Sequence, residues 1–369
     1  MYASMGAGHK RAADALHEVF KSRSIETESH DLLEFLPVTM AKFYSWAYTF
    51  MITDARWLWQ QLYKGMDKPR SPYAPAESFL HKWQFTRLEI FLKQKQFTHL
   101  LSTHFTPSAL LTDWKARGGI SGKIFSVVTD YAAHRCWKRK GLDGYFVASQ
   151  DVASQLAEAG IPSDRITVSG IPISPAFRTI ESRENSRAAL DLPAGDTVLL
   201  VLCSGLNLQK SLTVLRQLAE LSGPLRFLVS TGSDPLKEQK IRASFQNDSR
   251  YNIFGFSPKI AQMMRAADLV VTKPGGLIVS EALAMGAALV LFPPIPGQEQ
   301  ANADYAAREG AAVGLRDESE AGTALARLLS APSDVQSMRK AAARIGKPNA
   351  AGTIVDRVAG ETHASHTNL

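Results

Sequence analysis

Short apolar runs rich in branched side chains alternate with helical stretches along the whole chain, and this alternation constrains the fold more than any other feature. Val198–Leu202 and Ala288–Phe292 are continuously apolar. Strands of that kind are buried on both faces, which is typical of parallel sheets covered by helices. Successive βαβ units with right-handed crossovers then form doubly wound sheets. The sequence therefore predicts an α/β protein.

The alternation predicts five strands in each half of the chain, whose 369 residues suit two domains. The expected strands are Ile25–Leu32, Thr98–His104, Lys123–Asp130, Gly144–Ser149 and Ile166–Gly170, then Thr197–Ser204, Leu225–Thr231, Tyr251–Phe254, Leu269–Thr272 and Ala288–Phe292. The proline-rich stretch Gly170–Pro175 is the natural linker. We expect two facing Rossmann-like domains with an interdomain cleft, at 1–172 and 173–345. A C-terminal helix and tail at 346–369 are expected to pack back on the first domain.

The chain opens on a glycine-rich turn. The residues from Tyr2 have the character of a strand exit, yet almost no strand precedes them, so the first strand is expected to be truncated. Gly6-Ala-Gly8-His9 leads into an amphipathic helix. Glycines at such a turn let backbone amides approach a ligand, and a helix N-terminus favours negative charge. We expect His9 at the cleft outside the carboxyl ends of the strands, where ligands of open α/β sheets bind.

Cysteine content and charge bear on location and partners. Cys136 and Cys203 are the only cysteines and fall in different expected domains, which favours a reduced, cytosolic protein without a disulfide framework. We find no secretory signal pattern and no apolar run long enough to span a bilayer. The net charge is +7, and residues 1–172 hold 21 Lys and Arg against 16 Asp and Glu. This balance suits an anionic surface or a phosphate ligand, and equally mere solubility.

The strongest local signal is Thr272-Lys-Pro-Gly-Gly276, with Glu281 five residues further on. A strand ends here, two glycines form a turn and a helix begins. The amides of Gly275, Gly276 and Leu277 are predicted to hold a diphosphate, and Glu281 to accept hydrogen bonds from ribose hydroxyls. The alternative is a tight turn followed by a solvated glutamate.

A loop stiffened by prolines follows the next expected strand. Phe292-Pro-Pro-Ile-Pro-Gly is followed by Gln298, Glu299 and Asn302. Hydroxyl-rich ligands need fixed donors and acceptors of this kind. We predict that the three side chains bind the ligand, although the pattern alone also fits an ordinary helix cap and turn.

Three stretches resemble one known family. The glycine–histidine opening, Val128-Thr-Asp130-Tyr-Ala-Ala-His134-Arg-Cys-Trp137, and the segment from Gly255 to Asn302 are similar to the monogalactosyldiacylglycerol synthases and processive diacylglycerol glucosyltransferases. This group is a branch of glycosyltransferase family 28, which also contains the peptidoglycan N-acetylglucosaminyltransferase acting on lipid I. The resemblance extends over residues 2–315.

The resemblance implies a GT-B fold and an inverting enzyme that uses a UDP-sugar and needs neither a metal nor another cofactor. It implies that Glu281 contacts the ribose and that Gln298 and Glu299 contact the donor sugar. His9 is then the candidate base, or the residue that positions the acceptor, and Asp130 orients it or shares its role. The expected reaction moves a hexose from UDP-galactose or UDP-glucose to diacylglycerol, and the sequence does not distinguish the two sugars.

One loop departs from the family pattern. Relatives usually carry a glycine-rich loop after the first strand of the second domain, whereas this chain has Cys203-Ser-Gly205-Leu-Asn207, with a single glycine. We expect Ser204 and Asn207 to make the phosphate contacts in its place.

An aromatic and basic segment points to the acceptor. The stretch Lys42–Arg70 holds eight of the chain's 32 aromatic residues, Trp57 and Trp59 among them, and five Lys or Arg against two Asp. Such a segment suits a helix or hairpin in the interface of an anionic membrane. The alternative is a pair of buried helices that pack on the first sheet.

A second basic cluster, His134 to Lys140, contains Arg135 and Trp137. We expect it to touch anionic headgroups, with a solvated loop as the alternative, and we expect Gly8 on the acceptor side beside His9. Together these features predict a peripheral protein on the inner face of the cell membrane, without a nucleic-acid partner.

The sequence leaves three functions open. The first is a glycolipid synthase at a membrane surface. The second is a UDP-N-acetylglucosamine-dependent transferase that acts on a polyprenyl-linked or soluble acceptor. The third is a protein that binds a UDP-sugar or lipid but has weakened turnover, which the loop with one glycine and the short first strand favour.

Overall fold

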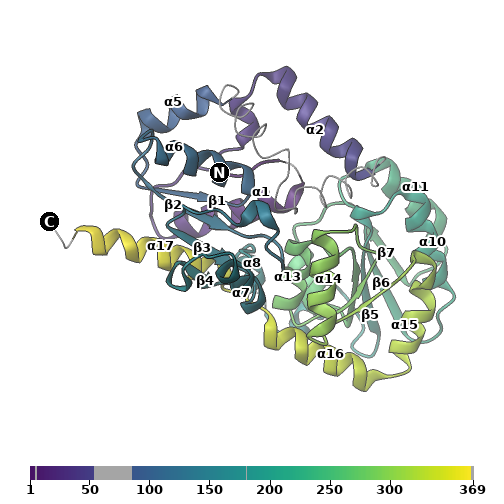
Figure 1. The fold of residues 1–369 in the computed structure, drawn as a ribbon. Coiled ribbons are helices and arrows are strands. Elements are labelled where there is room, and N and C mark those ends of the chain that lie inside the picture. The colour runs from purple at the N-terminus through teal and green to yellow at the C-terminus, as the bar shows by residue number, and fades with distance from the viewer. Residues whose placement is uncertain (5, 54–84, 180, 367–369) are drawn as a thin grey trace. The chain divides into compact units, whose positions relative to one another are not determined.

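The computed structural model describes residues 1–4, 6–53, 85–179 and 181–366 (Figure 1). The chain divides into two compact units. The first comprises residues 1–175, 295–298 and 349–369, and the second comprises residues 176–294 and 299–348. The sequence placed the corresponding boundaries after residues 172 and 345.

The first unit is a parallel sheet flanked by helices. Its strands, in their order across the sheet, are β1 (His99–Ser102), β2 (Lys123–Val127), β3 (Gly144–Val147) and β4 (Ile166–Val168). Its helices are α1 (Ala7–Ser22), α2 (Val38–Thr53), α5 (Thr86–Lys95), α6 (Phe105–Ala116), α7 (Gln150–Glu158) and α17 (Ala350–His366), with the 3-10 turns η1 (Leu32–Phe35), η2 (Arg135–Trp137) and η3 (Ser163–Arg165). The four strands pair in parallel throughout, as the apolar runs predicted.

The predicted strand Ile25–Leu32 is wrong as a regular strand, because only one residue of it forms a bridge. Tyr2 pairs with Asp31 in a single parallel bridge, with Tyr2 N donating to the His30 carbonyl at 3.0 Å and Leu32 N to the Tyr2 carbonyl at 2.8 Å. The segment that contains Met1 and Tyr2 also bonds to the residue that follows β1, because Thr103 N donates to the Met1 carbonyl at 3.1 Å. Among the described residues, the predicted strand Ile25–Leu32 therefore forms a single bridge and no longer ladder.

The C-terminal helix α17 belongs to the core of the first unit. Ile354, Val355 and Val358 are almost fully buried and pack with Leu16 and Phe20 of α1. Arg23 and Asp356 form an ion pair at the edge of this contact. The same cluster contains Phe125 and Val127 of β2 and Phe146 of β3, and Figure 1 shows the yellow helix α17 beside this sheet. The last helix thus closes the face of the first sheet, although the preceding 50 residues belong to the second unit.

The second unit is a six-stranded parallel sheet. Its strand order is β10 (Ala312–Gly314), β9 (Ala288–Leu291), β8 (Leu269–Thr272), β5 (Thr197–Leu202), β6 (Leu225–Ser230) and β7 (Tyr251–Phe254). Its helices are α8 (Ala176–Thr179), α9 (Arg183–Ala188), α10 (Leu208–Ala219), α11 (Pro235–Phe245), α12 (Ile260–Ala266), α13 (Gly276–Ala284), α14 (Gln298–Arg308, except its first residue), α15 (Ala321–Leu329) and α16 (Pro332–Ile345), with the turns η4 (Cys203–Gly205) and η5 (Glu318–Glu320). Strand β10 was not predicted, because its three residues Ala-Val-Gly carry little of the β-branched signal.

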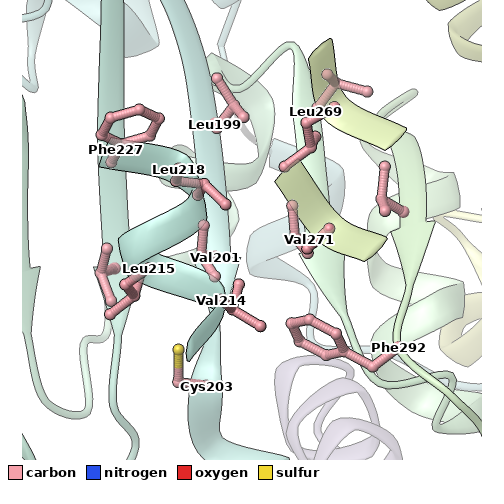
Figure 2. Packing of buried hydrophobic residues seen from close by; sticks show 14 of the residues in the cluster. Leu199, Val201, Cys203, Val214, Leu215, Leu218, Phe227, Leu269, Val271 and Phe292 are labelled. Atoms are coloured by element: carbon pink, nitrogen blue, oxygen red, sulfur yellow. The ribbon is translucent and has the colours of Figure 1, made fainter. Parts of the chain in front are cut away.

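The core of the second unit explains why α10 forms where it does (Figure 2). Asn207 caps the helix by accepting from Lys210 N at 2.9 Å. Val214, Leu215 and Leu218 then share one face of α10 and are fully buried. Figure 2 shows these side chains beside residues of β5, β6 and β8 in one apolar cluster. The packing places the amino end of α10, with its preceding loop, at the carboxyl end of β5.

The strand order contains a switch point between β5 and β8. From β5 the chain proceeds outward through β6 and β7, and then returns to β8 on the other side of β5 before proceeding to β9 and β10. In open α/β sheets, ligands bind in the crevice outside the carboxyl ends of the strands at such a point. A ligand site in this unit is therefore expected at the loops after β5 and β8.

Candidate active site

In the first unit, His9 is held by residues that directly follow two strands. Its Nδ1 lies 2.8 Å from the Thr103 carbonyl oxygen, just past β1, and 3.0 Å from Thr129 Oγ1, just past β2. Thr103 Oγ1 also donates to the His9 carbonyl at 2.8 Å. Gly6, the residue that caps α1, has a φ of 98°, a conformation that suits glycine and lets the chain turn into the helix. His9 therefore sits at the carboxyl edge of the sheet.

The hydrogen bonds define which nitrogen of His9 carries the proton. A carbonyl oxygen can only accept, so at 2.8 Å the Nδ1 must be the donor to Thr103. In the neutral ring the lone pair is then on Nε2. Burial lowers the pKa of His9 to about 4, and the hydrogen bond to the Thr103 carbonyl opposes only part of this shift. Because this pKa lies well below the ordinary value near 6.5, the imidazole is neutral throughout the physiological pH range.

This lowered pKa gives the first testable prediction. If the neutral Nε2 of His9 takes the proton in the reaction, kcat/KM should stay nearly constant from pH 7.5 down to about 5. It should fall only as the pH approaches the folded-state pKa of about 4. A pH–rate profile measured where the protein stays folded checks this. A half-maximal rate near pH 6.5 would mean that the imidazole titrates at its ordinary value and would contradict the lowered pKa of His9.

A row of rings continues from His9. The His104 ring lies 4.5 Å from the His9 ring in an edge-to-face arrangement and stacks on Phe105 at 4.2 Å. His104 Nδ1 accepts from Thr106 N at 3.1 Å, which caps α6. Phe105 in turn contacts the rings of His134 at 5.2 Å and of Trp137 at 5.8 Å. This row fixes the His9 side chain from the side of β1.

The structure corrects the expectation for Trp137 and keeps Arg135 at the surface. Trp137 is only 1% exposed, so its indole belongs to the interior and is not a headgroup contact. Arg135 is exposed in the same turn, η2. The reason is that the tryptophan fills the space beside Phe105, whereas the charged neighbour stays in water. Gly8 lies in the first turn of α1 beside His9.

Asp130 is buried, at 7% exposed, in the loop that follows β2. The predicted strand ended at Asp130, but the observed strand ends at Val127, which leaves the aspartate beyond the sheet edge. Its neighbour Thr129 contacts His9 directly. The structure thus brings the loop that contains Asp130 to His9.

In the second unit, the predicted diphosphate turn has the expected local geometry. Gly275 precedes α13 with an extended conformation (φ −70°, ψ 142°), and no side chain caps the helix. The first amides of α13, including those of Gly276 and Leu277, thus lack a side-chain acceptor at the N-cap position. The turn follows β8, which pairs with β5 at the switch point. An uncapped helix end at this position suits an anionic ligand.

Two of the predicted ligand residues lie inside the protein. Glu281 is 1% exposed within α13, and Asn302 is fully buried in α14. Asn302 Nδ2 donates to the Pro274 carbonyl at 3.1 Å, so this amide holds the turn before α13. The structure gives Asn302 a supporting position, which differs from the direct contact that the sequence suggested.

The other two predicted residues of this loop fall in different units. Glu299 Oε1 lies 3.1 Å from Lys273 Nζ, beside the turn that precedes α13. Gln298 groups with the first unit, where its Nε2 lies 3.2 Å from Nε2 of His134. His134 Nδ1 accepts from Cys136 N at 3.2 Å.

The loop after β5 forms the turn η4. Ser204, Gly205 and Asn207 are exposed. Asn207 uses Oδ1 to cap α10, as described above, so this oxygen is engaged in the helix cap. The sequence reasoning missed Thr103 and Thr129, although each is the last residue but one of a predicted strand, Thr98–His104 or Lys123–Asp130, and this place at a strand's carboxyl end is the signal that could have found them.

No group of three or more His, Cys, Asp or Glu side chains among residues 1–4, 6–53, 85–179 and 181–366 is arranged to hold a metal ion. In the same part of the chain, no helix has both the length and the apolar character needed to cross a bilayer.

Comparison with known proteins agrees with this geometry. Residues 9–173 match the family model described as monogalactosyldiacylglycerol (MGDG) synthase, and residues 206–354 match that of the glycosyltransferase family 28 C-terminal domain. Processive diacylglycerol beta-glucosyltransferases from two Bacillus cereus strains, B4264 and ATCC 14579, are each 29% identical over 376 residues, spanning 100% of this chain and 94% of the relative.

Solved structures share the fold at low identity. Acinetobacter baumannii MurG has a TM-score of 0.53 at 17% identity, covering 74% of this chain and 76% of that one. The UDP co-structure of S. aureus MnaA has a TM-score of 0.57 at 14% identity, covering 75% and 78%. At these identities the likeness concerns the fold alone.

The two parallel sheets with flanking helices, together with these neighbours, define a protein of the GT-B fold, and the matched domains make it a glycosyltransferase. The predicted fold and enzyme class are therefore confirmed. Residues 9–173 thus match the monogalactosyldiacylglycerol synthase family and residues 206–354 match the C-terminal domain of glycosyltransferase family 28, in agreement with the resemblance found in the sequence.

Proposed function

We propose that this glycosyltransferase moves a hexose, glucose or galactose, from a UDP-sugar to diacylglycerol at the inner face of the cell membrane, with inversion at the anomeric carbon. The observation that carries the donor part is the uncapped amino end of α13 at the switch point of the second sheet, with Glu281 buried in the same helix. The diacylglycerol acceptor is supported by the full-length similarity to processive diacylglycerol beta-glucosyltransferases.

The chemistry divides between the units. The hydroxyl of diacylglycerol attacks the anomeric carbon, a new C–O bond forms, and the bond to the β-phosphate oxygen breaks. The neutral Nε2 of His9 takes the hydroxyl proton, and Asp130 orients the imidazole or shares this role. UDP departs with the bonding electron pair, and the amides of Gly276 and Leu277 stabilise its charge. In this proposal Glu281 binds the ribose, and no metal or other cofactor takes part.

Helix α2 supports the proposed action at a membrane surface. Phe43 and Trp46 are each 61% exposed, and Phe50 is 42% exposed. These residues are spaced three and four apart, so they share one face of the helix, and the rings of Trp46 and Phe50 stack at 5.6 Å. A helix whose aromatic face is exposed suits the interfacial region of a bilayer. Trp57 and Trp59, on which the sequence based the same idea, lie outside the described residues.

The membrane proposal predicts the behaviour of a double variant. Phe43→Ser with Trp46→Ser should reduce co-sedimentation with vesicles containing anionic lipid by about tenfold or more, because two large apolar side chains no longer enter the interface. The thermal unfolding midpoint should hardly change, since both residues are exposed. Phe256→Ser, which alters a 79% exposed aromatic of the second unit, is the matched control. Unchanged vesicle binding in the double variant would remove α2 from the interface.

The whole proposal is tested with radiolabelled UDP-glucose and UDP-galactose, each incubated with the protein and diacylglycerol vesicles. We expect a labelled glycolipid from one of the two sugars. Labelled product from UDP-N-acetylglucosamine and a polyprenyl-linked acceptor alone would point to the alternative transferase. Binding of UDP without any product would identify a protein with lost turnover.

A further inference from the structure

Two lysines from different elements contact the loop after β5, where the family resemblance led us to expect more glycines. One is Lys237 of α11, and the other is Lys273, which directly follows β8. Neither was singled out by the sequence. The inference below rests on the proposed function, because it concerns the diphosphate of the same UDP-sugar.

Lys237 is a buried lysine, 5% exposed, beneath this loop. Its Nζ donates to the carbonyl oxygens of Cys203 at 2.6 Å and Leu206 at 2.8 Å. Figure 2 shows Cys203 at the end of β5, beside the core of the unit. A buried ammonium is costly unless its charge does something for the structure or for a ligand. Here it holds both ends of a four-residue turn.

The two carbonyl contacts determine where the adjacent amides point. A trans peptide group is planar, with its N–H directed opposite to its C=O. Because the Cys203 and Leu206 carbonyls point towards Lys237, the N–H groups of Ser204 and Asn207 point away from it. Those residues are exposed, so the amides face the solvent side of the loop. Outward amides in a tight turn make a concave site for anions, as a glycine-rich loop does.

Lys273 brings a second positive charge to the same loop. A Cβ on Gly205 would overlap Cδ of Lys273, so the lysine stem lies directly across this glycine. Gly205 is therefore the position where this loop needs a glycine, because a larger residue would clash with the Lys273 side chain. The side chain crosses from the end of β8 to the end of β5, the two strands at the switch point. Its Nζ is 3.1 Å from Glu299 Oε1 and the side chain is 44% exposed, so a ligand can reach it.

The sequence already predicts phosphate contacts from the loop Cys203–Asn207, and we propose that two lysines complete this diphosphate subsite. Lys273 binds the diphosphate directly, exchanging Glu299 for phosphate oxygens, and Lys237 is a positioning residue that turns the Ser204 and Asn207 amides outward. A lysine ammonium binds phosphate as a point charge, and it adds to the amides of α13 that begin three residues later. Two lysines thus replace the contribution of the missing glycines.

The test compares ligands that differ in phosphate number. Lys273→Met keeps the stem over Gly205 and removes the charge. We expect UDP affinity, measured by calorimetric titration, to fall at least tenfold, UMP affinity to fall less, and uridine affinity to stay unchanged. Inorganic pyrophosphate should compete with UDP in the natural protein and compete poorly in the variant. Lys340→Met, the same charge change at an exposed site on α16, should leave all four ligands unaffected.

The outcomes separate this inference from the proposed function. If the natural protein binds no UDP, the proposed donor is wrong. If it binds UDP and Lys273→Met binds UDP equally well, the lysine assignment alone is overturned. An equal loss for uridine and UDP would also overturn it, because the lysine would then act on the nucleoside and not on the phosphates.

Lys237→Met tests the positioning role. A selective loss of UDP affinity relative to uridine affinity, in protein that still unfolds cooperatively, supports outward amides as phosphate ligands. An equal loss for both ligands indicates a structural role only and overturns this part of the proposal. Should the variant fail to fold, Lys237→Gln, which keeps a hydrogen-bond donor without the charge, provides the same comparison. Gly205→Ala, whose Cβ would displace Lys273 while Lys237 stays in place, is a further test of Lys273.

Discussion

Replacing His9 by alanine is expected to lower turnover by a factor of about 10² or more, because the acceptor hydroxyl loses the group that takes its proton. The affinity for UDP should be largely unchanged, since His9 belongs to the first unit, whereas Glu281 and the amides of Gly276 and Leu277, which we propose bind UDP, belong to the second. Turnover is measured with the labelled UDP-sugar and diacylglycerol vesicles, and donor binding by calorimetric titration with UDP. A loss confined to turnover identifies an interaction made in the transition state.

Two companion variants sharpen this result. His17→Ala changes another histidine of the same helix α1, two turns further on, and should leave turnover near normal. Asp130→Asn should give a smaller or comparable loss if the aspartate orients His9 or shares its role. A His9 variant with near-normal turnover, or one whose main defect is in UDP binding, would transfer the base role to Asp130 or elsewhere.

The low pKa of His9 favours its role as a base in one respect and weakens it in another. Near pH 7 the ring is neutral and Nε2 carries its lone pair, but a base of pKa about 4 holds a proton less firmly than an ordinary imidazole. Burial also lowers the pKa of His104. Between the unfolded value near 6.5 and these lower folded values, the unfolded chain binds more protons than the folded one. Acidification through this range therefore destabilises the protein, and stability returns as the pH rises.

The sheets were predictable because their physical signal is local. A parallel strand covered on both faces must be apolar at every position, as in Val198–Leu202, and the observed β5 includes that run. The turn before α13 was predictable for a similar reason, since a strand end, two glycines and a helix start occur within a few residues. Ligand sites at strand ends follow from the topology once the strands are known.

Side-chain directions were not predictable from the sequence. Trp137 lies in a basic cluster that suggested a surface, yet its ring is buried beside Phe105, a residue 32 positions earlier. Asn302 holds the Pro274 carbonyl from a different helix. Lys273 crosses Gly205 from the neighbouring strand end. Each of these contacts joins segments far apart in the chain, so no local pattern encodes it.

The second large effect concerns the donor. Glu281→Ala is expected to weaken UDP binding by about 1.5–3 kcal/mol, the range for a hydrogen bond that involves a charged group. This corresponds to about a 10- to 150-fold rise in Kd. The carboxylate lies one turn after Gly275–Gly276 and is 1% exposed, so a ribose hydroxyl bonded to it would be shielded from water. Calorimetric titration with UDP measures the change.

Burial makes a second ligand necessary for this test, because alanine at position 281 leaves a cavity that can disturb the whole helix. The natural protein should bind 2′-deoxy-UDP more weakly than UDP if Glu281 accepts from the 2′-hydroxyl. In Glu281→Ala that preference should disappear, since neither ligand then has the partner, and the cycle isolates the pairwise contact. Glu281→Gln, which keeps the volume and one acceptor oxygen, should show an intermediate loss. Unchanged UDP affinity in both variants, or an undiminished preference for UDP in the alanine variant, would remove Glu281 from the ribose site.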